Sequence, residues 1–285
     1  MKEKPILIIG NTGKTGVRIQ QRLEKLGYPT RGASRSSTPR FDWNEPATWQ
    51  GVLSGVSRAY VSFHPDLAIP AAEKIIYGFV TAARDAGVEH LVLLSGRGEE
   101  GAIRAENVVK ASGLSWNIVR ASWFAQNFSE GFMLEGILNG ELVLPECRVR
   151  EPFIDVDDIA DVAVAALTKT NLRNKLFEVT GPRFITFEEC ILAINAAVSS
   201  IDCRTIQYIP VPIEDYIDAL KSQGFPEDFQ WLVRELFTVV LDGRNTPVVN
   251  GVEEALGRPA TDFNDYVKKA LAAGAWAPQV QVSNA

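Results

Sequence analysis

The sequence predicts an α/β protein with a Rossmann-type, doubly wound parallel sheet and a smaller C-terminal α/β substrate domain. The first observation is the run Ile6–Ile9, four apolar residues typical of a strand buried on both faces. The second is the spacing Gly10-x-x-Gly13-x-x-Gly16 directly after this run, followed by residues with a helical period. The third is an alternation of strand-like and helical segments, which indicates a parallel sheet with right-handed crossovers.

The glycine turn and the helix after it predict a site for a dinucleotide pyrophosphate. Glycine has no Cβ, so backbone N–H groups can approach phosphates closely, and the helix N-terminus adds roughly half a positive charge. A phosphate-binding loop of nucleoside triphosphatases is excluded, because Ile8 stands where that motif needs a glycine. The alternative is an ordinary tight turn. The candidate cofactor residues here are Gly10, Asn11, Thr12, Gly13, Lys14, Thr15 and Gly16.

Further elements follow from the apolar periods along the chain. Strands are predicted at residues 28–33, near 40–41, and at 57–63, 90–95, 115–120, 176–181 and 204–211. Helices are predicted at 69–86, 103–111, 159–167 and 186–198, with another from residue 212. The pattern Thr186-x-x-Glu189 indicates a capping box. Ligands of parallel sheets bind beyond the carboxyl ends of the strands, so we look for chemistry there.

The end of the second strand favours NADP(H) over NAD(H). Ser34, Arg35 and Ser36 stand where NAD-selective folds carry an acidic residue. A carboxylate would repel a 2′-phosphate, whereas arginine and hydroxyl groups would bind it, and Lys14 adds a second positive charge. The alternative is that Arg35 is an ordinary solvated arginine.

Asp42, Trp43 and Phe63 complete the candidate cofactor site. Asp42 is predicted to accept a hydrogen bond from the adenine amino group, and Trp43 to flank the ring. Phe63 ends the strand at 57–63 and is assigned to the same site. The alternative is that Asp42 and Trp43 only anchor their loop.

Composition limits the function classes. The chain has 285 residues and a net charge of −6, so we expect no nucleic acid and no membrane as partner. The start of the chain lacks the apolar core of a signal peptide, and no apolar run is long enough for a membrane span. Three cysteines without a C-x-x-C spacing support no disulfide framework and no metal site. We therefore expect a cytoplasmic protein with a small-molecule substrate, and a homo-oligomer stays open.

Several motifs together resemble the NmrA-like group, an atypical branch of the short-chain dehydrogenase/reductase superfamily. They are the glycine run, Arg35, the segments 120–130 (RASWFAQNFSE) and 152–163 (PFIDVDDIADVA), and Gly257-Arg258-Pro259 with Phe263. The resemblance implies an NAD(P)-binding Rossmann domain at residues 1–181, in which 124–150 contribute to the cleft, and a substrate or cap domain at 182–285. The group includes NAD(P)H-dependent quinone, azo-dye, imine and enone reductases, and also redox-sensing regulators that bind the cofactor without turnover.

The sequence departs from the superfamily at its Tyr-x-x-x-Lys pair. Gly98 and Ala102 occupy the tyrosine and lysine slots, so neither side chain can protonate a substrate. Glu106 and Lys110 have a similar spacing, but we interpret them as an (i, i+4) pair on the helix surface.

Three residues are candidates for the missing catalytic function. Ser95 ends a strand where the superfamily carries its catalytic serine, and it also counts among the cofactor residues. Arg97 could stabilise negative charge that develops on the substrate. His64 ends another strand and has a side-chain pKa that suits a proton donor. The alternatives are a turn residue for Ser95, a solvated charge for Arg97, and for His64 a loop residue that touches the cofactor ribose or a turn residue before Pro65.

The segment after residue 120 is predicted to contact substrate. Trp123 and Phe124 offer an apolar wall for a ring, and Gln126 and Asn127 could orient it. The alternative is that the aromatic side chains belong to the core and that Asn127 caps a helix.

The acidic run at residues 155–158 is interpreted as the start of a helix, because no histidine lies nearby to complete a metal site. The last residues, 278–285, are predicted to be disordered. The sequence thus predicts an NADP(H)-dependent oxidoreductase that transfers hydride to a small aromatic or conjugated acceptor of the quinone, enone, imine or azo type. The alternative is a non-catalytic NADP-binding redox sensor or regulator of the NmrA type.

Overall fold

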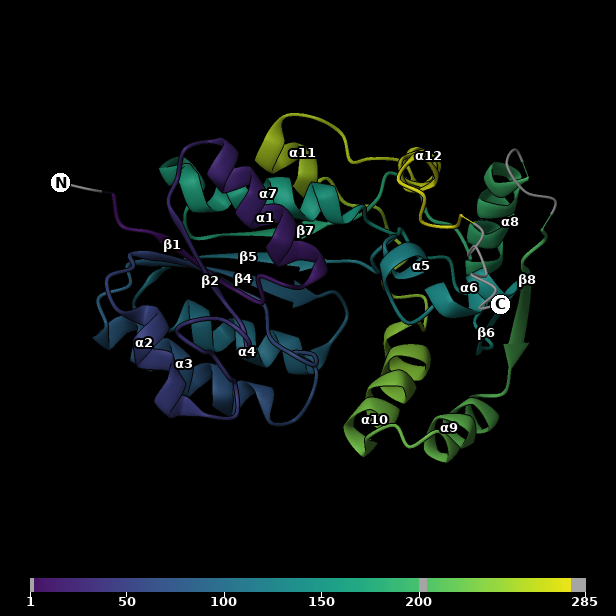
Figure 1. Cartoon of the computed structure of the whole chain (residues 1–285), viewed down its shortest axis with the longest axis horizontal. Coiled ribbons are helices and arrows are strands. Elements are labelled where there is room, and N and C mark those ends of the chain that lie inside the picture. Colours follow the sequence, from purple (N-terminus) through teal and green to yellow (C-terminus); the bar gives the residue numbers. More distant parts are fainter. Residues whose placement is uncertain (1–2, 200–203, 278–285) are drawn as a thin grey trace, which may run out of the picture. The chain divides into compact units, whose positions relative to one another are not determined.

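The computed structural model describes residues 3–199 and 204–277, which form two compact units (Figure 1). Unit 1 comprises residues 1–123, 156–180 and 248–260, and unit 2 comprises 124–155, 181–247 and 261–285. This division differs from the predicted boundary after residue 181. The segment 124–155 belongs to unit 2, and the segment 248–260 returns to unit 1.

Unit 1 contains a six-stranded parallel sheet in the order β2-β1-β3-β4-β5-β7. The strands are β1 (Ile6–Ile9), β2 (Thr30–Ala33), β3 (Arg58–Val61), β4 (His90–Gly96), β5 (Ser115–Ala121) and β7 (Lys175–Val179). The predicted α/β class with a parallel sheet is confirmed. β1 is fully buried, as expected for a strand covered by helices on both faces.

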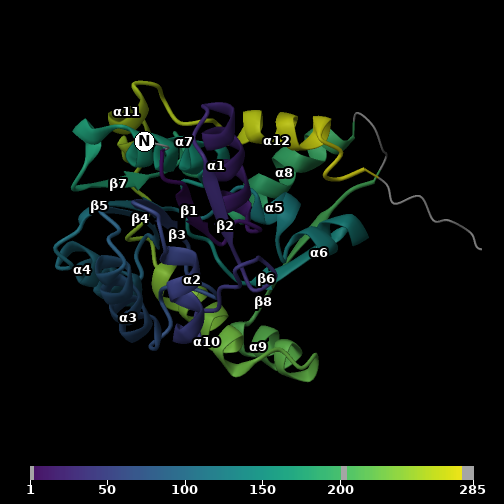
Figure 2. The same cartoon turned by 60° about the vertical axis from the view of Figure 1, so that its left-hand side comes forward.

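Helices cover both faces of this sheet (Figures 1 and 2). On one face lie α1 (Lys14–Lys25), α7 (Val156–Thr168) and α11 (Gly251–Leu256). On the other face lie α2 (Trp49–Leu53), α3 (Ala72–Asp85) and α4 (Glu100–Lys110). Short 3₁₀ turns occur at Pro46–Thr48 and Thr170–Leu172. The segment around α11 is fixed to α7 by Arg258, which donates hydrogen bonds to Asp158 at 2.7 Å and to Asp161 at 2.5 Å.

The strand predicted near residues 40–41 is wrong, because these residues form a loop. The Phe41 N–H donates to the carbonyl of Ser34 at 2.9 Å, so the backbone turns back on β2 instead of extending a ladder. The Phe41 side chain is buried against Trp43 and Phe79, so its apolar character serves packing rather than a strand.

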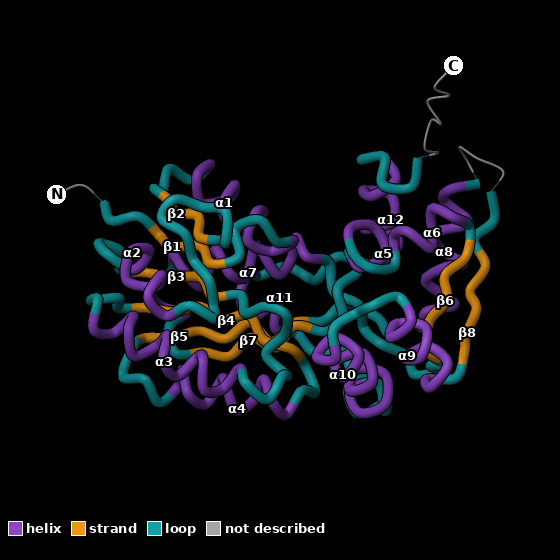
Figure 3. Tube along the Cα trace, turned by 60° about the horizontal axis from the view of Figure 1, so that its bottom comes forward, coloured by secondary structure: helices purple, strands orange, loops and turns teal. Residues whose placement is uncertain are grey.

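Unit 2 has a two-stranded parallel sheet, β6 (Glu141–Pro145) with β8 (Gln207–Val211), drawn in orange in Figure 3. Its helices are α5 (Asn127–Glu130), α6 (Leu134–Asn139), α8 (Phe187–Val198), α9 (Ile213–Ser222), α10 (Glu227–Glu235), a π-helical stretch Leu236–Val240, and α12 (Phe263–Ala272). The predicted capping box is confirmed, since Thr186 accepts from the Glu189 N–H and Glu189 accepts from the Thr186 N–H.

An aromatic core holds unit 2 together. Phe128, Phe153, Phe187 and Phe263 are buried with ring centroids 5.2 to 6.2 Å apart, and Trp276 donates its indole N–H to the Phe128 carbonyl. In residues 3–199 and 204–277 no helix combines the length and the apolar character that crossing a membrane requires. The predicted disorder of residues 278–285 lies outside the described residues.

Candidate functional site

The glycine turn after β1 has the geometry of a phosphate cradle. Gly10 has φ 76°, a left-handed conformation that side chains rarely adopt, and the Gly13 N–H donates to its carbonyl at 2.9 Å. A Cβ added at Gly16 would lie 2.2 Å from the Gly10 oxygen, so only glycine permits this approach of helix to turn. Gly13 is the N-cap of α1, and no acidic residue stands in the first turn of that helix. The turn therefore fits an anion at the helix N-terminus.

Three further residues of the turn that are predicted to bind the cofactor, Asn11, Thr12 and Thr15, differ in the exposure and the contacts of their side chains. Thr15 is buried, and its hydroxyl accepts a hydrogen bond from Tyr60 at 2.8 Å, so its side chain connects α1 to β3. Asn11 donates to Gln20 at 3.3 Å and lies beside Gly32 of β2, whereas Thr12 is exposed. Thr15 can therefore contact a cofactor only through its backbone, whereas the Thr12 side chain is exposed to solvent.

The loop after β2 is a hydroxyl-rich turn. The Ser34 N–H donates to the Ser37 hydroxyl at 2.9 Å, and the Ser34 and Ser36 hydroxyls lie 3.2 Å apart. Arg35 is exposed within this turn, and residues 34–37 contain no carboxylate. The composition and exposure of the turn suit a phosphate group.

The structure brings Arg35 close to His64, which follows β3. His64 is an exposed residue, yet partial burial of its ring lowers its pKa. The positive charge of Arg35 lowers this pKa further, and Asp66 opposes the shift. His64 is therefore neutral at physiological pH, which weakens its predicted role as a proton donor.

A carboxyl pair lies next to His64, and the sequence analysis missed it. Asp66 accepts a hydrogen bond from the Ala68 N–H at 2.8 Å, and its carboxyl group hydrogen-bonds with that of Glu99. Burial raises the pKa of Asp66. Glu99 is buried at the N-cap of α4, beside the glycine in the tyrosine slot. Two carboxyl groups can share a hydrogen bond only when one of them is protonated, and the raised pKa of Asp66 favours that form.

Ser95 and Arg97 belong to an ion-pair network at the ends of β4, β5 and β7. Register places Ser95, Arg120 and Glu178 in one row across these strands. Ser95 donates to Glu106 at 2.8 Å, and Arg97 donates to Glu178 at 2.7 Å. Both side chains thus have structural partners, and their catalytic roles stay predictions.

The interpretation of Glu106 as a surface residue is wrong. Its carboxylate is 0% exposed and accepts hydrogen bonds from Ser95 and Arg120 as well as from Lys110. The hydrogen bonds and the arginine charge lower its pKa although burial opposes this. The (i, i+4) spacing in the sequence reveals only Lys110 as a partner of Glu106. The other two partners, Ser95 and Arg120, come from the neighbouring strands β4 and β5.

Trp43 and Phe63 are packed in an aromatic cluster of unit 1. Trp43 is 8% exposed and lies 5.0 Å from Phe63 and 5.1 Å from Phe79, measured between ring centroids. Asp42 accepts hydrogen bonds from Arg40 and from the Asn44 N–H. These contacts fit the alternative of loop anchors, and the adenine contacts of Asp42 and Trp43 stay predictions.

The predicted substrate residues divide between core and surface positions. Trp123 is buried and is the last residue of the first segment of unit 1. Phe124 is half-buried and is the first residue of unit 2. Gln126 is 3% exposed and donates to Asp155 at 2.7 Å, so it serves the interior of unit 2. Asn127 begins α5 and is half-buried. Of the four, Phe124 and Asn127 keep the most accessible surface for a substrate.

The acidic run of residues 155–158 is confirmed as a helix start. Asp157 and Asp158 lie in the first turn of α7. Arg22 of α1 donates to Asp157 at 2.7 Å, which neutralises part of this charge. Within residues 3–199 and 204–277 no group of three or more histidine, cysteine or acidic side chains is arranged to hold a metal ion.

Several curated proteins match the chain over nearly its whole length, and two of them are the following. It is 30% identical to agroclavine dehydrogenase of Claviceps fusiformis, covering 92% of this chain and 96% of that protein. It is 29% identical to NAD(P)H azoreductase of Xenophilus azovorans, covering 94% of this chain and 98% of that protein. No family model matches the sequence.

Solved structures show the same fold. Triphenylmethane reductase of Citrobacter sp., complexed with NADP(H), has a TM-score of 0.71 at 19% identity, covering 93% of this chain and 99% of that one. NmrA, a negative transcriptional regulator in complex with NADP, has a TM-score of 0.72 at 14% identity, covering 99% of each chain. The chain belongs to the NmrA-like family of the short-chain dehydrogenase/reductase superfamily.

Proposed function

We propose that this protein is an NADP(H)-dependent oxidoreductase that transfers hydride to a small aromatic or conjugated acceptor of the quinone, enone, imine or azo type. The observation that carries the proposal is the pairing of a glycine cradle at Gly10–Gly16 with the carboxylate-free turn around Arg35. Relatives named as an NAD(P)H azoreductase and an agroclavine dehydrogenase support the same reaction class.

The residues present fit a phosphorylated dinucleotide. Backbone N–H groups of the turn and the N-terminus of α1 would hold the pyrophosphate. Arg35, with the hydroxyl groups of Ser34 and Ser36, would hold the 2′-phosphate. When bound, NADPH supplies a hydride, and the protein supplies orientation and charge.

Reduction of a conjugated bond also requires a proton. His64 has a lowered pKa and is neutral at physiological pH, so it is a poor donor. Burial raises the pKa of Asp66, which favours a proton on the carboxyl pair of Asp66 and Glu99, beside Gly98 in the tyrosine slot. We assign the proton reservoir to this pair, with His64 as the group through which it exchanges with solvent.

One specific observation favours the alternative, a non-catalytic NADP-binding regulator. Gly98 and Ala102 replace the tyrosine and lysine of typical reductases, and NmrA, a regulator, shares the fold. The reductase is preferred because a carboxyl pair is present near the vacant tyrosine position and because two curated relatives, an azoreductase and a dehydrogenase, are oxidoreductases by name.

The decisive experiment measures NADPH oxidation with a panel of quinones, azo dyes, enones and imines, beside calorimetric titration of NADPH. Turnover with at least one acceptor supports the reductase. Tight NADPH binding without any oxidation supports the regulator, and absence of binding contradicts both.

We further propose a cytoplasmic location. Cys147 and Cys190 are free thiols, and burial raises the pKa of both, which suits a reducing compartment.

A further inference from the structure

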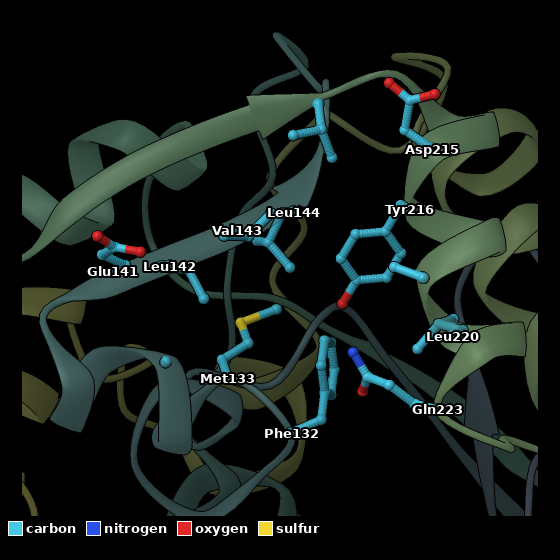
Figure 4. Close-up of a pocket in the computed structure, with 13 residues that line it drawn as sticks. Phe132, Met133, Glu141, Leu142, Val143, Leu144, Asp215, Tyr216, Leu220 and Gln223 are labelled. Atoms are coloured by element: carbon cyan, nitrogen blue, oxygen red, sulfur yellow. The ribbon is translucent and has the colours of Figure 1, made fainter.

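Unit 2 contains a cavity of about 410 Å³ that the nucleotide site does not use (Figure 4). Its walls come from β6, the end of β8, the residues around α6 and one side of α9. This volume lies in the range of sites for small organic molecules, roughly 300–1,000 Å³.

The walls of the cavity are apolar and partly aromatic. Met133, Leu142 and Leu144 are almost fully buried and form its floor. Phe132 and Tyr216 come from two different segments, and Figure 4 shows both rings facing the same space. The Phe132 side chain is 48% exposed, so its ring is accessible to a ligand. Such walls suit a flat ring.

Two polar groups point into this space. Figure 4 shows the Tyr216 hydroxyl and the Gln223 amide turned toward each other across the cavity mouth. Among the residues that the structure describes, none hydrogen-bonds with either of these two side chains. Burial raises the pKa of the Tyr216 phenol, so it stays a neutral hydroxyl. A ligand can therefore receive one or two hydrogen bonds here.

The charge around the cavity is of one sign. Glu141 and Asp215 lie at its rim, and the described residues that line it include neither lysine nor arginine. Carboxylates at the rim attract cations and repel anions, and the faces of Phe132 and Tyr216 stabilise a positive charge by cation–π interaction.

We propose that this cavity binds a flat aromatic molecule that carries a positive charge. The aromatic walls select the ring, the rim carboxylates select the charge, and Tyr216 with Gln223 orients the ligand. This inference concerns the ligand class of unit 2 and does not depend on hydride transfer.

The test is a fluorescence titration of the full chain, without nucleotide, with N-methylacridinium as the probe. Three matched compounds separate ring from charge: uncharged acridine at mildly alkaline pH, anionic acridine-9-carboxylate, and tetramethylammonium. We expect N-methylacridinium to bind about tenfold more tightly than acridine, and the other two compounds not to bind. Added salt weakens binding of the probe, because the rim carboxylates are exposed.

Variants then locate the probe. Tyr216→Ala removes a ring wall and is expected to lower affinity tenfold or more. The double variant Glu141→Gln/Asp215→Asn, at two exposed positions, is expected to reduce the preference for N-methylacridinium over acridine. The control is Tyr77→Ala on α3, which removes a 66% exposed tyrosine of unit 1 and should leave binding unchanged.

Several results would overturn the proposal: equal affinity for N-methylacridinium and acridine, no effect of the rim variant, or an effect of Tyr77→Ala alone. If Tyr216→Ala does not fold, the rim variant and Tyr216→Phe test the proposal instead. The rim variant must then show a smaller preference for N-methylacridinium over acridine, and Tyr216→Phe must still bind the probe. Probe binding without NADPH oxidation by any acceptor would leave this inference intact and remove the proposed reductase.

Discussion

The guanidinium of Arg120 donates two hydrogen bonds to the carboxylate of Glu106, from Nε to Oε1 at 2.8 Å and from Nη2 to Oε2 at 2.5 Å. Ser95 donates to the same carboxylate, whose side chain is fully buried. The negative charge of Glu106 is thus compensated inside unit 1, and α4 is fixed to β4 and β5 by this group.

Glu106→Gln is expected to lower the free energy of unfolding by roughly 1.5–3 kcal/mol, because it removes the charge that accepts hydrogen bonds from Arg120 and Ser95 at a fully buried position, while Arg120 keeps its ion pair with Glu178. Since the folded-state pKa of Glu106 is lowered, the stability it contributes is present above the unfolded pKa and is lost as pH falls below it. Urea unfolding at several pH values checks both statements. Glu89→Gln, at an exposed position, is the control, and an equal effect of both variants would contradict the prediction.

Arg35→Ala is expected to weaken NADPH binding about tenfold or more, because a hydrogen bond to a charged group contributes roughly 1.5–3 kcal/mol. NADH binding should hardly change, since NADH lacks the 2′-phosphate. Calorimetric titration of both nucleotides gives the ratio, with Arg84→Ala on α3 as control for the loss of an exposed arginine.

The same Arg35→Ala variant has a second readout that needs no nucleotide. Because the positive charge of Arg35 lowers the pKa of His64, the variant should raise that pKa. An NMR titration of the His64 ring measures the shift. An unchanged pKa would show that Arg35 and His64 do not lie close together in solution.

His90 is expected to make the protein less stable in acid. Its Nε2 lies 3.1 Å from the Ala166 carbonyl, which only accepts, so Nε2 is the donor there, and its Nδ1 lies 3.0 Å from the Ser115 hydroxyl. Burial lowers its pKa to about 4, while the unfolded value is 6.5. The unfolded chain therefore binds more protons between these values, and stability falls by up to about 1.4 kcal/mol per unit as pH drops through this window.

Urea unfolding between pH 4 and 7 measures this slope, and His90→Gln should flatten it. His64→Gln is the control, because His64 is exposed and contributes less to the slope. A slope that His90→Gln leaves unchanged would contradict the prediction.

Asp66→Asn is expected to stabilise the protein at neutral pH. Because burial raises the folded-state pKa of Asp66, the wild-type pair loses stability as pH rises above the unfolded pKa. Asparagine keeps an acceptor for the Ala68 N–H and always offers an N–H donor to Glu99. The melting temperature should rise at pH 7 and not at low pH. If the pair also supplies the proton, this variant should reduce turnover in the same buffer.

The sequence predicts the parts of this protein that depend on neighbours along the chain. The strand at Ile6–Ile9, the glycine turn and the capping box at Thr186 follow from local chemistry, and the structure confirms them as elements. The carboxyl pair could not be found in this way, because Asp66 and Glu99 come from loops after different strands and neither loop carries a distinctive motif.

The burial of the Glu106 carboxylate could not be predicted from the sequence either. The spacing of Glu106 and Lys110 is typical of a surface pair, and only the register of β4 against β5 brings Ser95 and Arg120 to the same carboxylate. Similarly, Gln126 resembles a substrate contact until Asp155, distant in sequence, is seen to bind it.

The chain passes between its units after residues 123, 155, 180, 247 and 260, so no single cut in the gene yields either unit whole. A fragment ending at residue 181 would lose Asn250, which bridges Val179 on the outer strand of the sheet, and Arg258, which binds α7. Its β7 edge would be uncovered, and such edges promote aggregation. To produce unit 1 by itself, a designed linker must therefore rejoin residues 248–260 to the rest of that unit. Shortening the gene at one end is not sufficient.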